Sequence, residues 1–537
     1  MSVTFAYSRT QRTFVALAMV WLAACSREAA PPAAQTPRDQ SAPAVDVVEL
    51  SAVDASARMT AGTLTSRALT EAYLDRIRQI DAAGPMLNAV IEISTTALAD
   101  AEKLDGERKA GKVRSPLHGI PILIKDNIDI AGMVNSAGSL ALADNRPKED
   151  AFIVRRLRDA GAVILGKTNL SEWANFRSTR STSGWSSRGG QTKNPYVLDR
   201  NPCGSSSGTG AAIAASLASI GVGTETDGSI ICPASVNGLV GIKPTVGLVS
   251  RRGIIPIAAS QDTAGPMARS VADAAMLLTA LAGVDERDPA ATAATGTIPS
   301  RYDIPNDAAL KGRRVGVLRQ ALGFHPGVDA AFTRAIDLIE AEGATVVDVK
   351  IGRYNDWNDA ELDVLLYEFK DGLNQYLKAS GSPHASLEAI IAFNKAHADT
   401  VMPFFGQELF ERAQAKGPLT DAAYRTAREE ARRLAGTEGL LAALDRDRLD
   451  AIIAPSMSPA WPTDHVLGDH FVGAGYGMAA VAGTPSITVP MGDVYGLPLG
   501  LTLMGRAYAE ADLIALAYSL EQKTKARRPP QFTPTAP

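Results

Sequence analysis

Residues 118–127 read HGIPILIKDN, and this short stretch decides the fold class. The apolar run Ile120–Ile124 is continuous rather than alternating, and it ends at Lys125. Such a run is typical of a strand that is covered on both faces, as in a sheet sandwiched by helices. Because proline has no backbone N–H to donate, Pro121 places the strand at a sheet edge or marks its first residues.

Helical and strand-like patterns alternate along the rest of the chain. This alternation predicts the α/β class: one large domain over residues 47–537, whose mixed, twisted sheet is sandwiched by helices on both faces. Residues 350–445 are charged, helical and poorly patterned, so we expect a helical insertion that covers the core. We expect helices over 69–80, 152–160, 211–219, 332–342 and 512–521, and strands over 162–165, 344–349, 450–454 and 499–504.

The composition argues against nucleic-acid binding and indicates where an active site lies. The chain has 54 basic and 58 acidic residues, a net charge of −4, so no basic field favours nucleic acid. Glycine, with 46 residues in all, clusters with serine between about residues 183 and 229. Glycine reaches backbone conformations that other residues avoid, so the unusual backbone of this region makes it the place to look for chemistry.

The N-terminus has the pattern of an export signal. Arg9 and Arg12 precede an apolar run over residues 14–24, which is shorter than the roughly 20 residues of a membrane span. The run ends in Leu-Ala-Ala-Cys25, which resembles a bacterial lipobox; an ordinary signal peptide with a chance cysteine is the alternative. We expect residues 1–24 to be removed, Cys25 to be lipidated and the Ala/Pro-rich residues 25–46 to form a tether. The protein would then be anchored to a bacterial membrane, facing the periplasm.

Two further cysteines, Cys203 and Cys232, lie in the Gly/Ser region. They can pair in an oxidising compartment. Free cysteine is, however, one of the most buried residue types, and both positions lie close to the expected chemistry. We therefore expect them to be small buried hydrophobic residues, with a disulfide as the alternative.

A first chemical signal is the stretch CGSSSG at residues 203–208. Gly204-x-Ser206-x-Gly208 matches the nucleophile elbow of α/β-hydrolases. That elbow needs a strand directly before it, whereas residues 194–202 have the composition of a loop, and no histidine lies in a recognisable setting. We therefore reject the elbow.

Two other signals are weaker when each is taken alone. In residues 224–230 (TETDGSI), Ser229 follows a glycine turn that can present free backbone N–H groups as an oxyanion hole, although an ordinary polar turn has the same composition. Lys125 ends an apolar strand. It either extends to solvent or, in a dry setting, loses its proton and becomes a general base.

Together these signals resemble the amidase signature family over nearly the whole mature chain, closest to the branch that contains bacterial peptide amidase. The order and joint occurrence of the matching stretches are very specific. The matches are residues 118–127, 166–169 (GKTN), 204–208 (GSSSG), 228–230 (GSI), 241–245 (GIKPT) and 497–501 (LPLGL).

The resemblance implies a role for each motif residue. Ser229 matches the nucleophile, Ser205 the bridging serine that follows a cis peptide bond, and Lys125 the base. The oxyanion would rest on the backbone N–H groups of Thr226, Asp227, Gly228 and Ser229. The implied reaction is hydrolysis of a linear amide through an acyl-enzyme, without a metal or an organic cofactor.

Two departures from the family pattern bear on the substrate. The family usually has glycine at Asp227 and often arginine at Ile231, and loss of that arginine removes an anchor for a carboxylate. Peptide amidase of the similar branch releases ammonia from C-terminal carboxamides. The aromatic residues Trp173, Phe176 and Trp185, with Ile231, either line a substrate pocket or pack in the core.

Three functions from different classes follow. The favoured one is a lipoprotein amidase whose partners are a small-molecule or peptide amide and the membrane surface. A component of a tRNA-dependent amidotransferase shares the signature, but the export signal argues against it. An idle ligand-binding lipoprotein is disfavoured because Lys125, Ser205 and Ser229 are all present. The natural amide, the balance between amidase and esterase activity, the membrane that holds the anchor and the oligomeric state are open.

Overall fold

The structure is a computed structural model that describes residues 45–293, 296–303 and 308–536. Val45–Pro537 form one compact unit. The expected signal peptide, the lipidation site Cys25 and nearly all of the expected tether lie outside the described residues.

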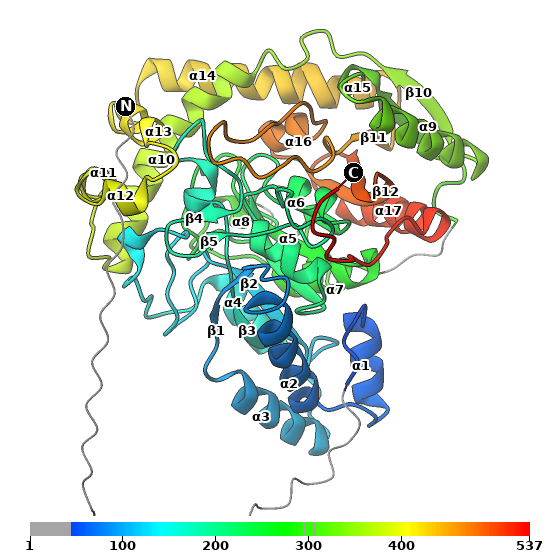
Figure 1. Ribbon diagram of the computed structural model, residues 1–537. Coiled ribbons are helices and arrows are strands. Elements are labelled where there is room, and N and C mark those ends of the chain that lie inside the picture. Colours follow the sequence, from blue (N-terminus) through cyan, green and yellow to red (C-terminus); the bar gives the residue numbers. More distant parts are fainter. Residues whose placement is uncertain (1–44, 294–295, 304–307, 537) are drawn as a thin grey trace, which may run out of the picture. The chain divides into compact units, whose positions relative to one another are not determined.

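The described residues form a mixed, 11-stranded sheet (Figure 1). Its spatial order is β1-β3-β2-β6-β8-β7-β12-β13-β11-β9-β10. The pairs β3–β2–β6 and β11–β9–β10 are parallel, and the other neighbours are antiparallel. The strands are β1 Val90–Ile93, β2 Pro121–Lys125, β3 Val163–Thr168, β6 Ile220–Glu225, β7 Val240–Lys243, β8 Thr263–Ala268, β9 Arg314–Leu318, β10 Thr345–Val349, β11 Ala451–Pro455, β12 Ser486–Val494 and β13 Leu497–Met504; β4 Trp185–Ser186 and β5 Gly190–Gln191 form a separate hairpin.

Helices flank this sheet, which confirms the predicted α/β class of one large domain. Helices α17 and α9 pack against β12, α7 packs against β8, and α5 packs against β6. The helices are α1 Ala52–Thr60, α2 Ser66–Arg76, α3 Ala97–Lys109, α4 Phe152–Asp159, α5 Ser207–Ala214, α6 Ile231–Val236, α7 Val271–Leu281, α8 Pro289–Ala293, α9 Pro326–Ala341, α10 Asn358–Ser380, α11 Leu387–Ala396, α12 Ala398–Val401, α13 Glu408–Gln414, α14 Ala422–Arg432, α15 Leu441–Arg446, α16 Gly477–Ala482 and α17 Glu510–Thr524.

Strand β2, which carries HGIPILIKDN, lies inside the sheet between β3 and β6. Pro121 is its first residue, so of the two positions that the sequence left open the structure has the strand start rather than the edge. All residues of β2 are buried, as the continuous apolar run predicts.

The Ala-rich helix is shifted relative to the prediction. It was expected over residues 211–219, but α5 begins at Ser207 and ends at Ala214. Glycine disfavours a helix, which is why the sequence did not predict the early start, but a Cβ on Gly208 would lie 2.4 Å from the carbonyl oxygens of Ala89 and Asn169. The close approach of other backbone, rather than flexibility, therefore accounts for glycine at this position.

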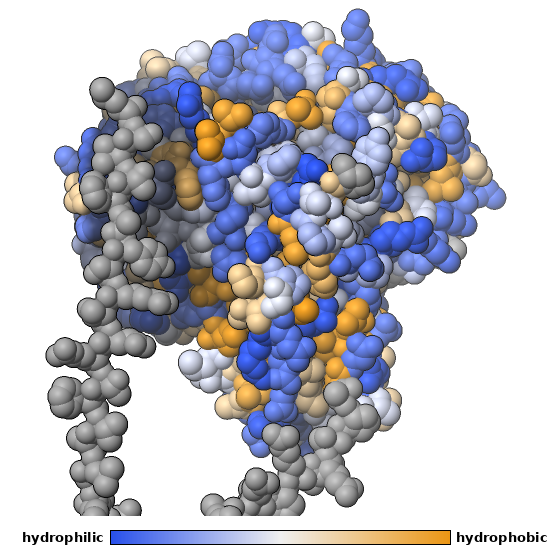
Figure 2. Space-filling model, viewed as in Figure 1, coloured by the Kyte–Doolittle hydropathy of each residue, from blue (hydrophilic) through white to orange (hydrophobic). Residues whose placement is uncertain are grey.

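Helices α10 to α15 occupy the segment between β10 and β11. Helix α10 packs against α13 and α14, and its Phe369, Leu373 and Leu377 belong to a hydrophobic cluster separate from the main core. The surface along α14 is mostly hydrophilic (Figure 2). Within the described ranges no helix combines the length and hydrophobicity that crossing a membrane requires.

Candidate active site

Lys125 ends β2 with its side chain fully buried. Its Nζ donates to Ser205 Oγ at 2.8 Å and to Thr224 Oγ1 at 2.9 Å, while the Thr224 carbonyl oxygen lies at 3.3 Å. Burial lowers the pKa of Lys125 well below its ordinary value, and the more distant Glu225 and Asp262 act against this only in part. No carboxylate pairs with Lys125 in the described part of the chain, so its neutral form is favoured.

Thr224 completes the surroundings of this lysine. It lies on β6, next to β2, and its Oγ1 also accepts a hydrogen bond from Asn127 Nδ2 at 3.0 Å. Two donors on one hydroxyl fix the position of Lys125 Nζ against Ser205. Sequence reasoning missed both Thr224 and Asn127 as site residues, although both lie inside stretches that it quoted.

Ser205 is fully buried and follows a cis peptide bond from Gly204, as the family resemblance implies. A Cβ on Gly204 would lie 2.1 Å from Ser171 Oγ, so only glycine fits there. The backbone N–H of Ser171 donates to the Ser205 carbonyl oxygen at 3.1 Å. Ser171 therefore packs closely against the backbone of Gly204 and Ser205.

Ser206 has a structural position rather than that of an elbow nucleophile. Its hydroxyl donates to the Thr224 carbonyl oxygen at 3.1 Å and accepts from the Thr224 N–H at 3.2 Å. Its own N–H donates to the Ser229 carbonyl oxygen at 3.2 Å. Ser206 thus ties the loop of Ser205 to β6 and to the loop of Ser229.

Ser229 lies in the turn between β6 and α6, and it lines a cavity of about 230 Å³ together with Ser205 and Thr226. Gly228 has φ 77°, and a Cβ there would lie 2.3 Å from the ring of Tyr476. Both a left-handed backbone and close contact with an aromatic ring therefore require glycine directly before Ser229.

Glu225 holds this turn in shape. Its Oε2 accepts from the N–H of Ile230 at 2.7 Å and from the N–H of Ile231 at 2.9 Å. Burial raises the pKa of Glu225, against the opposing effects of Lys243 and of these N–H groups.

The turn that carries Ser229 offers the backbone donors expected for an oxyanion hole. The N–H groups of Thr226, Asp227, Gly228 and Ser229 donate to no backbone carbonyl in the described part of the chain. Such groups are available to bind an oxyanion.

The sequence left open whether four residues line a substrate pocket or pack in the core, and the structure shows packing. None of Trp173, Phe176, Trp185 and Ile231 lines the cavity of Ser205 and Ser229. They are buried, because the rings pack against helices and loops of the segment between β10 and β11, and Ile231 packs at the start of α6. The ring contacts are Trp173 with Phe410 at 5.5 Å, Phe176 with Phe369 at 5.0 Å, and Trp185 with Phe405 at 5.2 Å.

Residues 254–257 line the cavity instead, with Ala174 and, beyond them, arginines such as Arg251 and Arg287. A second cavity, of about 550 Å³, adjoins the other side of the turn and is lined by Asp227 and Tyr476. The side chain of Asp227 is accessible through this second cavity, within a part of the molecule that is otherwise densely packed.

Cys203 and Cys232 form a disulfide with their Cα atoms 6.0 Å apart, so the expectation of unpaired buried cysteines is wrong. Sequence reasoning placed both near the chemistry but could not place the two loops against each other. The bond joins the residue before Gly204 to the third residue after Ser229, and both cysteines are buried.

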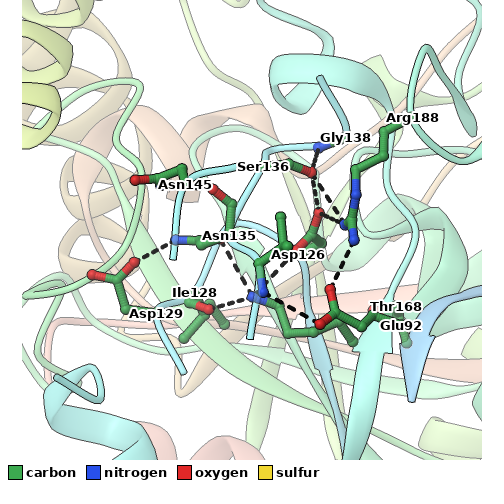
Figure 3. A network of polar contacts seen from close by, with 12 residues as sticks. Glu92, Asp126, Ile128, Asp129, Asn135, Ser136, Gly138, Asn145, Thr168 and Arg188 are labelled. Atoms are coloured by element: carbon green, nitrogen blue, oxygen red, sulfur yellow. Dashed lines mark hydrogen bonds and ion pairs between the residues drawn. The ribbon is translucent and has the colours of Figure 1, made fainter. Parts of the chain in front are cut away.

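A buried polar network surrounds Asp126, the first residue after β2 (Figure 3). The carboxylate of Asp126 pairs with Lys167 Nζ at 3.2 Å, both side chains being fully buried, and with Arg188 at 3.1 Å. The hydroxyl of Ser136 donates to the same carboxylate. Because Asp126 directly follows Lys125, this network fixes the backbone that carries the lysine.

Comparison with known proteins agrees with this geometry. The Amidase family model matches residues 68–514. The chain is 39% identical to a probable amidase of Arabidopsis thaliana, over 87% of this chain and 89% of that protein. It is 35% identical to a glutamyl-tRNA(Gln) amidotransferase component from Symbiobacterium thermophilum, over 89% of this chain and 97% of that protein.

Among solved structures, the native peptide amidase of Stenotrophomonas maltophilia superposes with a TM-score of 0.86 at 55% sequence identity, covering 90% of this chain and 99% of that one. Family model, relatives and fold therefore agree. The chain belongs to the amidase signature family, whose members are hydrolases that act on carbon–nitrogen amide bonds.

Proposed function

We propose that the protein hydrolyses carboxamides through an acyl-enzyme, with Ser229 as nucleophile, Ser205 as bridge and Lys125 as base. The observation that carries the proposal is the 2.8 Å contact between Ser205 Oγ and a fully buried lysine that has no counter-ion in the described part of the chain. A neutral lysine accepts a proton as histidine does in other hydrolases.

The proposed steps are those that the family resemblance implies, and the contact between Lys125 Nζ and Ser205 Oγ supports the first of them. Neutral Lys125 takes a proton from Ser205, and Ser205 takes one from Ser229 as Ser229 Oγ attacks the carbonyl carbon. The oxyanion is held by the backbone N–H groups of residues 226–229. Ser205 then donates a proton to the leaving nitrogen, and the C–N bond breaks to release ammonia or an amine. Water, activated through the same groups, cleaves the acyl ester and yields the carboxylic acid.

The substrate that we propose is a primary carboxamide, in particular the C-terminal amide of a peptide. The 55% identical solved structure is that of a peptide amidase, which supports this class.

Ammonia release tests the proposal. The purified protein would be incubated with an amidated dipeptide, and the Ser229→Ala variant would serve as the matched control. We expect ammonia from the wild type and none from the variant. Equal release by the two proteins, or none across a panel of primary amides, would overturn the proposed function.

We further propose that the mature protein is attached to a bacterial membrane through a lipid on Cys25 and faces the periplasm. The lipobox-like sequence that ends at Cys25 supports this location. In cells, the Cys25→Ser variant should move from the membrane to the soluble fraction. If the variant stays with the membrane, lipidation of Cys25 is refuted.

A further inference from the structure

The second cavity holds two carboxyl groups that the proposed mechanism does not use. It has a volume of about 550 Å³, within the range of roughly 300–1,000 Å³ that small-molecule sites have. Asp227 lines it from the turn that carries Ser229, and Glu361 lines it from α10. The exposed residues Asn355 and Phe471 also line this cavity, so it opens to solvent.

The carboxylate of Glu361 has a hydrogen-bond partner but no cationic partner in the described part of the chain. Its side chain is only 6% exposed, and its Oε1 accepts a hydrogen bond from Gln261 Nε2 at 2.8 Å. No group in the described part of the chain donates to its Oε2 or to the carboxylate of Asp227, and no lysine, arginine or histidine there forms an ion pair with either residue. Asp227 is exposed in the cavity and Glu361 is nearly buried, so both carboxylates are available to a cationic ligand that enters it.

The remaining lining favours a cation. The rings of Tyr354, Trp357 and Tyr476 face the same cavity, and aromatic faces attract an ammonium group. Burial raises the pKa of Glu361 to about 7. Burial, and then the proximity of Glu361, raises the pKa of Asp227 well above its ordinary value, while the distant Lys243 has only a small opposing effect. The negative charges of Asp227 and Glu361 repel each other, and a cation bound between them would reduce that repulsion.

The cavity is also within reach of the reaction centre. Asp227 is two residues before Ser229, so their Cα atoms are at most about 7 Å apart. An extended peptide advances about 3.3 Å per residue. The separation between Ser229 and this cavity is therefore comparable with the length of the one or two residues that precede a cleaved carboxamide.

We propose that the cavity of Asp227 and Glu361 is a subsite for a protonated amine on the acyl part of the substrate. This inference rests on the proposed amidase function and narrows it to short peptide amides that carry an ammonium group. That group is either the free N-terminus of a dipeptide amide or a basic side chain, and the two sources make the same contacts with the carboxylates.

Three substrates separate these possibilities: Gly-Phe-NH2, its N-acetyl derivative and N-acetyl-Lys-Phe-NH2. We expect the wild type to prefer Gly-Phe-NH2 over the neutral acetylated amide by at least about tenfold in kcat/KM, expressed mainly in KM. Recovery with the lysine substrate would assign the subsite to a side-chain ammonium. If the neutral amide is cleaved as well as both charged ones, the subsite is refuted.

The Glu361→Gln variant tests the residue itself. Glutamine keeps the acceptor for Gln261 but removes the charge, so the preference for the charged substrate should fall about tenfold or more. Glu368→Gln is the matched control. Glu368 lies on the same helix, is 4% exposed and bonds to Ser260 and Tyr424 away from the cavity. Its variant should keep the wild-type preference; an equal loss in both variants would refute a specific role of Glu361.

A binding measurement separates failure of this proposal from failure of the amidase function. In the Ser229→Ala background, calorimetry should show tighter binding of Gly-Phe-NH2 than of its acetylated form, and Glu361→Gln should remove the difference. This readout needs no turnover. If the Ser229→Ala protein binds the charged amide selectively but the wild type shows no turnover, only the proposed amidase reaction is rejected. Turnover without charge selectivity would reject only the subsite.

Discussion

Lys167 and Asp126 form an ion pair of 3.2 Å in which neither side chain has any exposure to solvent. Asp126 directly follows Lys125, the last residue of β2. Figure 3 shows the carboxylate of Asp126 within its polar network. A buried pair of this kind contributes little net stability compared with apolar residues, but removing one partner leaves an unpaired charge in a dry interior.

Replacing one member of this pair should therefore destabilise the fold strongly. For Asp126→Asn we expect the free energy of unfolding to fall by about 3–5 kcal/mol, measured by urea denaturation. The exposed pair of Arg353 and Asp356 provides the control, since Asp356→Asn should change stability by less than about 1 kcal/mol. A small effect of Asp126→Asn would mean that water reaches the network.

Protonation of Lys125 should affect both the catalytic rate and the stability of the fold. Lys125→Met should lower kcat by at least about a hundredfold, because the general base is lost. In the wild type, activity should fall on acidification as the lysine becomes protonated. A profile that stays flat down to about pH 4 would indicate a carboxylate base instead.

The stability of the same variant tests the lowered pKa. Between the lowered native pKa of Lys125 and the unfolded value of about 10.4, the unfolded chain binds one more proton, so stability rises with pH by about 1.4 kcal/mol per unit. Lys125→Met lacks this contribution. The wild type should therefore gain stability relative to the variant as the pH is raised from 7.5 to 9.5. Parallel curves would show that Lys125 is protonated in the native state.

Gly228→Ala should abolish the oxyanion hole. Its Cβ would lie 2.3 Å from the ring of Tyr476, and its φ of 77° is unfavourable for alanine. Displacement of the neighbouring N–H donors should lower kcat by about 10²–10³. Gly62→Ala is the control: Gly62 has φ 72° but no atom within 4 Å of the added Cβ, so its variant should keep full activity.

The disulfide should stabilise the arrangement of the two loops. The double variant Cys203→Ala/Cys232→Ala should lose about 2–4 kcal/mol of unfolding free energy. With dithiothreitol added during denaturation, wild type and variant should unfold at similar urea concentrations, because only the unfolded wild type exposes the bond. Equal stability without the reductant would show that the bond contributes nothing.

The sequence predicted the sheet well and singled out three candidate site residues, both for local reasons. A continuous apolar run identifies a buried strand, and Lys125, Ser205 and Ser229 lie in stretches whose order is specific to the family. The roles of Thr224 and Glu225 were missed, although both lie within the quoted stretch 224–230. Their hydrogen bonds depend on how β6 packs against β2 and on the curvature of the following turn.

Long-range placement explains the errors. Trp173, Phe176 and Trp185 are near the motifs in sequence, but they pack against residues 369–410, whose position no local pattern reveals. The cysteine pair was misjudged for the same reason. Glu361 belongs to a segment without clear patterning, so nothing in the sequence related it to Asp227.

The segment between β10 and β11 has a consequence for how such enzymes diversify. Trp357 and Glu361 belong to this segment, whereas Lys125, Thr224 and Ser229 are at the ends of β2 and β6 and in the turn that follows. If Glu361 binds the substrate as proposed, part of the selectivity is encoded apart from Lys125 and Ser229, whereas Asp227 is encoded beside Ser229. Mutation or exchange of α10 and its neighbours would then alter which amides are accepted while the ancestral reaction centre is inherited unchanged.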